Sequence, residues 1–212
     1  GDAESKADLA LLEKQLANLS DGKPARSIDG LTDAEQKRMP QLQLLTAKPV
    51  LYVCNVAESD AATGNSYSQK VADMAATQQA GHVIVSAAIE AEISQLDASD
   101  KGEFLAELGL EEAGLARLIR AGYGLLNLLT FFTVGPKEAR AWTVANGATA
   151  PQAAGVIHTD FQRGFIRAET ISYDDYITYK GEVGAKDAGK FRVEGAEYKV
   201  VDGDVFHFRF NV

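Results

Sequence analysis

Two short polar loops carry the residue types best suited to binding a purine base. The first is Asn55-Val56-Ala57-Glu58 and the second is Ser86-Ala87-Ala88, and each follows a strongly apolar run. An asparagine amide both donates and accepts hydrogen bonds, and exposed backbone N–H groups donate them. Because a mismatched base leaves buried polar groups unpaired, a site of this kind can discriminate strongly between bases.

The first loop leaves the choice of purine open. A guanine-binding Asn-Lys-x-Asp loop uses its aspartate to accept from guanine N1–H and the 2-amino group, but here Val56 replaces the lysine and the longer Glu58 replaces the aspartate. Adenine instead offers a donor at its 6-amino group and an acceptor at N1, which Asn55 and main-chain groups near Val56 could satisfy. Asn-x-x-Glu alone also fits a plain turn after a strand, and the second loop favours the base site.

The sequence lacks the groups that would bind phosphates. It holds no Gly-x-x-x-x-Gly-Lys-Ser/Thr loop, which would cradle them, and no Asp-x-x-Gly switch motif. The three histidines do not have the spacing of a metal site. We expect His82 and His207 to be structural and His158 to cap a helix end. We therefore predict neither a catalytic nor a metal-binding residue in this chain.

A parallel sheet would bring the two loops together. Residues 50–54 and 82–85 are continuous apolar runs typical of buried central strands, and residues 66–80 between them show helical spacing. Asn55 and Ser86 are 31 residues apart, which fits one βαβ unit with a right-handed crossover. Ligands bind at the carboxyl ends of strands in such sheets. The single cysteine, in the first run, is expected to be a buried, unreactive thiol in a reducing compartment.

Helices are predicted on both sides of this unit. Leucines recur at spacings of three and four over residues 5–19, which indicates one arm of a helical hairpin. Thr32-Asp33-Ala34-Glu35 is a capping box that begins a second helix, and Pro40 should interrupt it. Helical spacing returns from residue 90 to about residue 126. Ala121-Gly122-Tyr123-Gly124 is expected to form a hinge to the part that follows.

The periodicity changes to that of strands after residue 127. We predict strands at residues 128–133, 139–144, 165–171, 191–193, 198–201 and 205–210. A helix is expected over residues 149–158, and Glu194-Gly195 is expected to form a hairpin turn. One helix among several strands in about 85 residues indicates a compact α+β module.

The composition is that of a globular protein with two unequal parts. It is 46% hydrophobic and 24% charged, and it has no apolar run near the roughly 20 residues that span a bilayer. The net charge of −9 argues against nucleic-acid binding by the whole surface. Residues 1–127 carry 11 Lys and Arg against 19 Asp and Glu, whereas residues 128–212 carry 10 against 11. Only the second part is therefore expected to present a basic face.

Several stretches together resemble the Obg-like ATPases, the YchF family. They are residues 44–53, Asn55-x-x-Glu58, Ser86-Ala87, residues 89–92, 140–143, 148–161 and 202–212, and the similarity covers essentially the whole chain. The resemblance implies an α/β plus α+β fold, in which the C-terminal part of a P-loop nucleotide-binding domain with a coiled-coil arm precedes a β-grasp TGS domain. It places the returning arm at 1–30, the nucleotide-binding part with a helical extension at 31–127, and the TGS domain at 128–212.

The resemblance also implies a function. The intact parent would be a cytoplasmic, ribosome-associated hydrolase that prefers ATP to GTP, uses Mg²⁺, has the ribosome or ribosomal RNA as partner, and binds neither DNA nor a membrane. The family's base contacts carry over to Asn55 and Val56, and the rim of the pocket is completed by Glu58, Ser86, Ala87 and Ala88. The phosphate loop and the Mg²⁺ ligand have no counterpart in this chain, which is therefore expected to turn over no nucleotide alone.

A second class of function stays open, that of a non-catalytic interaction module. The nucleotide-binding half would then be scaffold, and the TGS-like part would bind RNA or a regulatory ligand. The candidate contacts are Lys137, Arg140, Arg163, Arg167, Lys190 and Arg192. Each of them alternatively is a solvated surface charge. Steep salt dependence of binding would favour this class.

Overall fold

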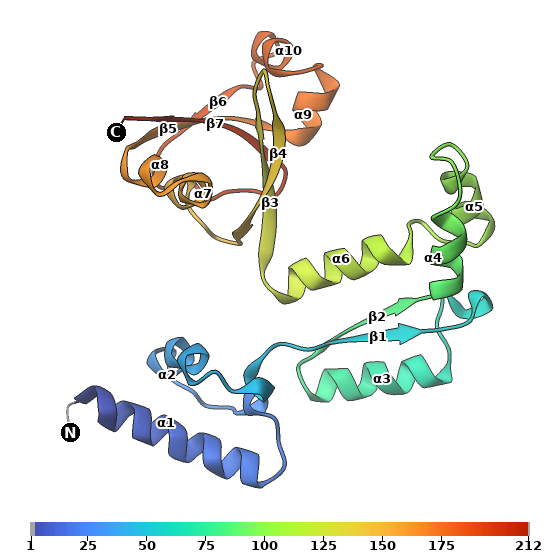
Figure 1. Ribbon diagram of the computed structural model, residues 1–212, viewed down its shortest axis with the longest axis vertical. Helices are drawn as coiled ribbons and strands as arrows, with labels where there is room; N and C mark the ends of the chain where they lie inside the picture. The colour runs from blue at the N-terminus through green and yellow to red at the C-terminus, as the bar shows by residue number, and fades with distance from the viewer. Residues whose placement is uncertain (1–2, 212) are drawn as a thin grey trace. The chain divides into compact units, whose positions relative to one another are not determined.

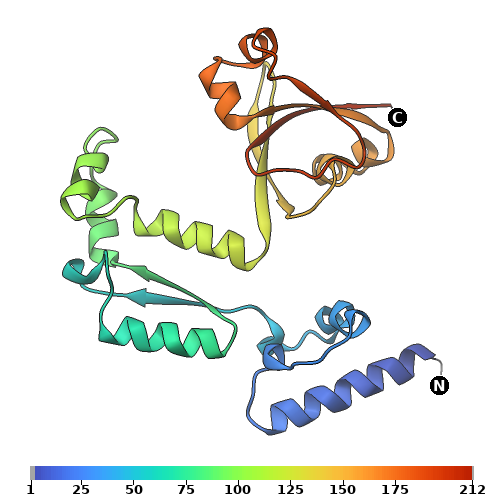
Figure 2. The ribbon, with the colours of Figure 1, turned by 180° about the vertical axis from the view of Figure 1, so that it is seen from behind.

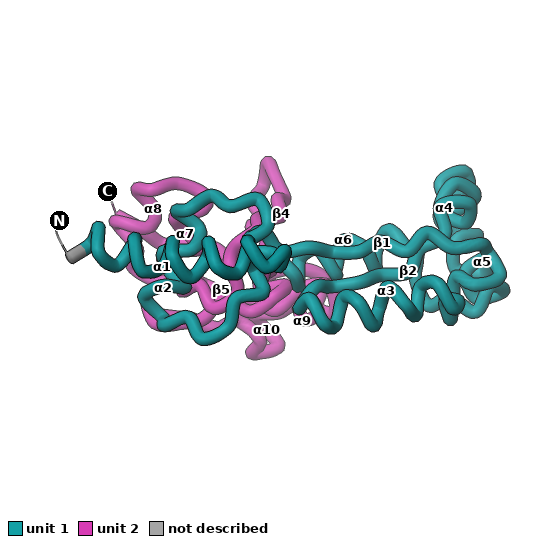
Figure 3. Tube along the Cα trace, turned by 90° about the horizontal axis from the view of Figure 1, so that it is seen from below, with its two compact units in different colours: residues 1–126 teal, residues 127–212 magenta. Residues whose placement is uncertain are grey.

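The chain divides into two compact units, residues 1–126 and 127–212, which Figure 3 colours separately. The computed structural model describes residues 3–211, and each unit is treated by itself. In the described range no helix combines the length and the apolar character that crossing a membrane requires. The first unit contains α1 (Ala3–Ser20), α2 (Asp33–Arg38), β1 (Leu51–Asn55), α3 (Ser66–Thr77), β2 (Gly81–Val85), α4 (Ala87–Ile93), α5 (Lys101–Glu107) and α6 (Gly114–Leu125) (Figure 1).

The leucine repeat near the start of the chain does form a helix, α1, as predicted. The helix buries Leu11 and Gln15, and the Gln15 amide donates to the carbonyl of Ala25 at 3.3 Å. The four leucines of the repeat lie instead on the exposed side, with 38 to 67% of their surface accessible; they are Leu9, Leu12, Leu16 and Leu19. The stripe that predicted the helix is thus not the face that packs against the rest of this unit.

The capping box of α2 is confirmed, and so is its interruption by proline. Thr32 Oγ1 accepts from the Glu35 N–H, and the Thr32 N–H donates to the Glu35 carboxylate at 2.8 Å. Lys14 of α1 reaches the same carboxylate at 2.6 Å, and this bond, with those from Thr32, lowers the pKa of Glu35 to about 2. After Arg38 the chain tightens into a 3₁₀ turn, Met39–Leu42, which contains Pro40.

The predicted βαβ unit is present. β1 and β2 pair in parallel, with Leu51 opposite Gly81 and Asn55 opposite Val85. Figures 1 and 2 show α3 and α6 on opposite sides of this strand pair. The prediction of two buried central strands is wrong, because in the described chain each strand has only one neighbour. Val53 is consequently 48% exposed, whereas Cys54 is buried, as expected of an inert thiol.

The helical region that follows β2 consists of three helices instead of one continuous run. Ile89 and Ile93 of α4 form a small core with Ala61 and Leu110, against which α5 packs Phe104. The hinge expected at residues 121–124 is wrong, because these residues lie inside α6. Each interior glycine costs a helix only about 1 kcal/mol relative to alanine, which a packed helix of 12 residues can tolerate.

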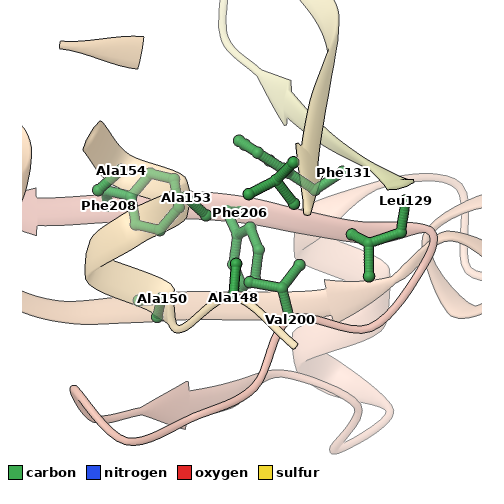
Figure 4. Close-up of a cluster of buried hydrophobic side chains, with 11 residues drawn as sticks. Leu129, Phe131, Ala148, Ala150, Ala153, Ala154, Val200, Phe206 and Phe208 are labelled. Carbon is green, nitrogen blue, oxygen red and sulfur yellow. The ribbon is translucent and has the colours of Figure 1, made fainter. Parts of the chain in front are cut away.

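The second unit is built on a five-stranded mixed sheet of order β4-β3-β7-β5-β6, in which only β3 and β7 run parallel. Its elements are β3 (Leu128–Val134), β4 (Ala139–Ala145), α7 (Ala150–Ile157), α8 (Thr159–Arg163), β5 (Phe165–Ser172), α9 (Tyr173–Thr178), α10 (Glu182–Asp187), β6 (Arg192–Glu194) and β7 (Asp204–Phe210). Figure 4 shows the core, where the alanines of α7 approach Phe206 and Phe208 of β7. Small side chains on α7 let the helix lie close to the sheet.

Three predictions for this unit need correction. Residues 198–201 form no strand, because their backbone bonds go to the start of α7, from Val200 N to Ala148 O and from Ala150 N to Tyr198 O, each 2.9 Å. The hairpin at Glu194-Gly195 is consequently absent, and β6 pairs with β5. The expectation of one helix among the strands is also wrong, because α8, α9 and α10 accompany α7 and none of these three was predicted. The expected cap at His158 is confirmed, since its Nδ1 accepts from the Asp160 N–H at 3.2 Å.

Candidate functional site

The two predicted loops meet at one edge of the β1–β2 pair. Both strands end there in register, and the Val56 N–H continues the ladder by donating to Val85 O at 2.9 Å. A side chain then joins the loops, because Asn55 Oδ1 accepts from the Ala87 N–H at 3.0 Å. This bond links residues 32 positions apart in sequence. The structure thus brings Asn55 and Val56 next to the loop that begins at Ser86.

The bond to Ala87 decides what Asn55 can offer a ligand. Its amide oxygen accepts this bond, while its Nδ2 group makes no hydrogen bond within residues 3–211, so the donor is the wholly unoccupied group of the amide. The Val56 N–H is also engaged in the strand ladder. Of the groups expected to meet adenine, Asn55 and the main chain near Val56, the Asn55 Nδ2 group is thus available to an acceptor atom of a base.

Ser86 is the most buried residue of the site. It is 2% exposed, and its Oγ has no hydrogen-bond partner in the described part of the chain. It precedes α4 as the N-cap residue, but its side chain makes no capping bond. Ala87 and Ala88 form the exposed first turn of α4, and Glu58 begins a separate, exposed 3₁₀ turn. A buried hydroxyl without a partner is costly, which marks this loop as unusual.

Most of the candidate cations in the second unit are already paired with carboxylates. Arg163 bonds to Asp160, Arg167 to Glu169 at 3.2 Å, Lys190 to Asp175 at 3.7 Å, and Arg192 to Asp204 at 3.2 Å. Arg140 is 4.0 Å from Glu138 and stacks over the ring of Trp142, and Lys137 makes no ion pair with any residue from 3 to 211. Lys137 and Arg140 are thus the two cations least committed to partners.

Two polar networks in this unit were missed by sequence reasoning. Glu169 is nearly buried, and a hydrogen bond from Arg209, with a second from Arg167, lowers the pKa of its carboxyl. Asp204 is 2% exposed and accepts from the Tyr198 hydroxyl at 2.9 Å and the Val201 N–H at 2.9 Å. Burial raises the pKa of Tyr198. Strand periodicity does not signal the contact between Arg209 and Glu169, because these residues lie on different strands, β7 and β5.

Among residues 3–211 no three His, Cys, Asp or Glu side chains are grouped closely enough to hold a metal ion.

Glu90 has a structural role that sequence reasoning missed. Its carboxylate accepts from the N–H groups of Gly114 and Leu115, at 2.6 and 3.1 Å. No signal in the sequence identifies this contact, because it joins residues 24 and 25 positions apart.

Comparison with known proteins gives a consistent result. Residues 128–211 match the family model YchF-GTPase_C, described as "Protein of unknown function (DUF933)". Along all of its 212 residues the chain is 55% identical to the ribosome-binding ATPase YchF of Escherichia coli O157:H7, and over 213 aligned residues it is 49% identical to that of Bacillus subtilis strain 168. Residues 128–211 belong to the YchF C-terminal family. The whole chain is similar to the C-terminal part of YchF proteins.

The similarity to YchF extends to solved structures. The structure of the Schizosaccharomyces pombe YchF GTPase matches 96% of this chain and 55% of its own chain, with a TM-score of 0.79 and 35% identity. A GTP-binding protein from Pyrococcus horikoshii OT3 shares the fold, with a TM-score of 0.54 and 17% identity over 97% of this chain and 64% of its own. The mixed α/β fold with a mixed sheet is thus that of a YchF structure. The chain spans 58% of the length of both bacterial relatives.

Proposed function

We propose that these residues form the base-binding and partner-binding part of an ATP-preferring, ribosome-associated nucleotide hydrolase. The observation that carries the proposal is the bond from the Ala87 N–H to Asn55 Oδ1, at the shared end of two parallel strands. It holds the two loops together and leaves the Asn55 Nδ2 group free to donate. The names of the bacterial relatives, ribosome-binding ATPases, support the same activity.

The proposed site binds the base by complementary polar groups and an apolar cover. Asn55 Nδ2 donates to an acceptor nitrogen of the purine, and the half-buried Val56 covers the ring face. The buried hydroxyl of Ser86, Ala87, the exposed first turn at Ala88, and Glu58 complete the rim. Because a guanine-specific lysine and aspartate are absent, we favour ATP over GTP. Phosphate and Mg²⁺ binding are assigned to the part of the parent that this chain does not cover.

The domain assignment is part of the same proposal. Residues 1–30 are the returning arm of a coiled coil, which would explain the exposed leucines of α1. Residues 31–127 are the C-terminal part of a nucleotide-binding domain, and residues 128–212 are a β-grasp TGS domain. The sheet of the second unit, with parallel β3 and β7 and the core helix α7, is compatible with that assignment. We place the parent in the cytoplasm, with the ribosome.

Replacing Asn55 by aspartate tests the base site. Aspartate keeps an acceptor for the Ala87 N–H but removes the Nδ2 donor, so the loops should stay joined while the bond to the base is lost. The assay uses a full-length fusion, in which the part of the E. coli O157:H7 relative that this chain does not cover precedes these residues. We expect Asn55→Asp to weaken ATP binding, measured by calorimetry, by about 1–3 kcal/mol.

Asn55→Ala serves as the comparison, because it removes both the donor and the acceptor. We expect it to weaken ATP binding at least as much as Asn55→Asp and, in addition, to speed hydrogen exchange of the Ala87 amide. Unchanged ATP affinity in both variants would remove Asn55 from the site and with it the proposed base recognition.

Ribosome binding by the second unit forms a separate prediction. Lys137 and Arg140 are the candidate contacts least occupied by carboxylates, so Lys137→Ala with Arg140→Ala should weaken co-sedimentation with ribosomes several-fold. Binding should fall steeply as salt rises, since each phosphate contact releases counterions. Lys190→Ala, which removes a cation paired with Asp175, is the control. Strong RNA binding without any nucleotide binding would instead support the non-catalytic module, and binding that is absent or independent of salt would contradict both.

A further inference from the structure

We propose that Glu90 is the positioning residue for the base-binding loop, which is Ser86-Ala87-Ala88. It acts through α4 on the Ala87 N–H that bonds to Asn55. The expected effect of Glu90 on ATP binding rests on the proposed base site. Its effect on the position of the loop can be measured without nucleotide. Three contacts carry it, one from the Glu90 main chain and two from its carboxylate.

The carboxylate of Glu90 caps a helix that has no cap of its own. Helix α6 follows Ala113, whose side chain cannot accept a hydrogen bond, so its first N–H groups need partners from elsewhere. Glu90 Oε1 accepts from Gly114 N at 2.6 Å, and Oε2 accepts from Leu115 N at 3.1 Å. Both oxygens are therefore used, in charge-assisted bonds that the helix dipole favours.

The main chain of the same residue closes the turn that forms the loop. The Glu90 N–H donates to Ser86 O at 3.0 Å, which makes it the first helical bond of α4. Helix α4 has seven residues and no side-chain cap at Ser86, so little within it fixes its direction. Because Glu90 is anchored to α6, the turn that presents the Ala87 N–H to Asn55 is anchored as well.

Gly114 allows this anchor to form at the end of β2. A Cβ at residue 114 would lie 2.9 Å from Glu90 Oε1 and 3.3 Å from the Cβ of Val85. Val85 is the last residue of β2, and it pairs with Asn55. The absence of a side chain at residue 114 lets α6 approach the strand end and the carboxylate at once. The end of β2, α4 and α6 therefore meet at Glu90, within one turn of the base-binding loop.

Amide hydrogen exchange in the 212-residue chain tests the structural part. Glu90→Gln removes the charge and replaces one carboxylate oxygen by an NH₂ group. That group cannot accept a hydrogen bond, so the N–H of either Gly114 or Leu115 loses its acceptor. We expect about tenfold faster exchange at Gly114 and Leu115, from the loss of charge-assisted bonds, and also at the remote Ala87. Glu92→Gln, an exposed position on the same helix, is the control and should leave Ala87 unchanged. If Glu90→Gln does not fold, Gly114→Ala displaces the same carboxylate and is measured instead.

The kinetic part uses the full-length fusion. Loss of positioning alone should raise KM for ATP about tenfold with little change in kcat, because a contact to the base is shared by ground state and transition state. A merely structural role would lower the active fraction, and hence kcat, at constant KM. Normal Ala87 exchange with unchanged KM in Glu90→Gln would overturn the inference. If Asn55→Asp also leaves KM unchanged, the proposed base site fails, whereas a raised KM in Asn55→Asp alone refutes only the role of Glu90.

Discussion

Purified residues 1–212 should release no phosphate from ATP above the uncatalysed rate, whereas the full-length fusion should hydrolyse it. Phosphoryl transfer depends on groups that position the phosphates and stabilise their charge, and the sequence holds neither a phosphate loop nor a switch motif. The expected difference in the rate of ATP hydrolysis between the fusion and the 212-residue chain is large, since enzymes commonly accelerate reactions by at least about 10⁶-fold. Phosphate release at saturating ATP and Mg²⁺ measures it.

The intact mass of the sample must accompany that assay, because a longer contaminating chain would give a false rate. The fusion, prepared in parallel, shows that the assay conditions support turnover. Hydrolysis that requires Mg²⁺ and persists in the 212-residue chain through repeated purification would contradict this assignment. Phosphate and Mg²⁺ binding would then not be confined to the part of the parent that this chain does not cover.

Gly164→Ala should produce a large loss of stability in the second unit. Gly164 follows α8, and its carbonyl accepts from Asn211 N at 2.9 Å. A Cβ at this position would overlap the Asn211 carbonyl oxygen, a backbone atom that cannot rotate away. The end of β7 must therefore move, and we expect the free energy of unfolding of the second unit to fall by about 3 kcal/mol. Urea unfolding followed by the fluorescence of Trp142, the single tryptophan, reports on this unit.

Gly122→Ala provides the matched control, because a Cβ at residue 122 meets no atom within 4 Å. Alanine is favoured over glycine inside a helix, so α6 should become more stable by about 0.5–1 kcal/mol. The Trp142 transition should not change in this variant. An unchanged Trp142 midpoint in Gly164→Ala would mean that Gly164 and Asn211 do not approach as described.

The sequence was sufficient to predict the elements that hold the candidate site. Apolar runs and the 31-residue spacing between Asn55 and Ser86 predicted a parallel pair whose ends coincide, as β1 and β2 do. Alternation predicted most strands of the second unit within a few residues. Periodicity is reliable for these elements because it reports which face of a strand is buried.

Contacts between separate elements were beyond the reach of periodicity. Residues 198–201 have the composition of a strand, yet their backbone bonds are taken by the start of α7. Spacing places Asn55 near Ala87 but gives no sign that the amide oxygen is used internally. The contact from Glu90 to Gly114 depends on how α6 approaches β2, which only the tertiary structure fixes.

A crystal structure of the full-length fusion with ATP and Mg²⁺ tests the central claim most directly, because it locates the base relative to Asn55. We predict the purine ring against Val56, with an acceptor nitrogen within about 3.2 Å of Asn55 Nδ2, and the bond between Asn55 Oδ1 and Ala87 N preserved. A base bound away from these loops, or an Asn55 amide that makes no hydrogen bond to it, would contradict the claim.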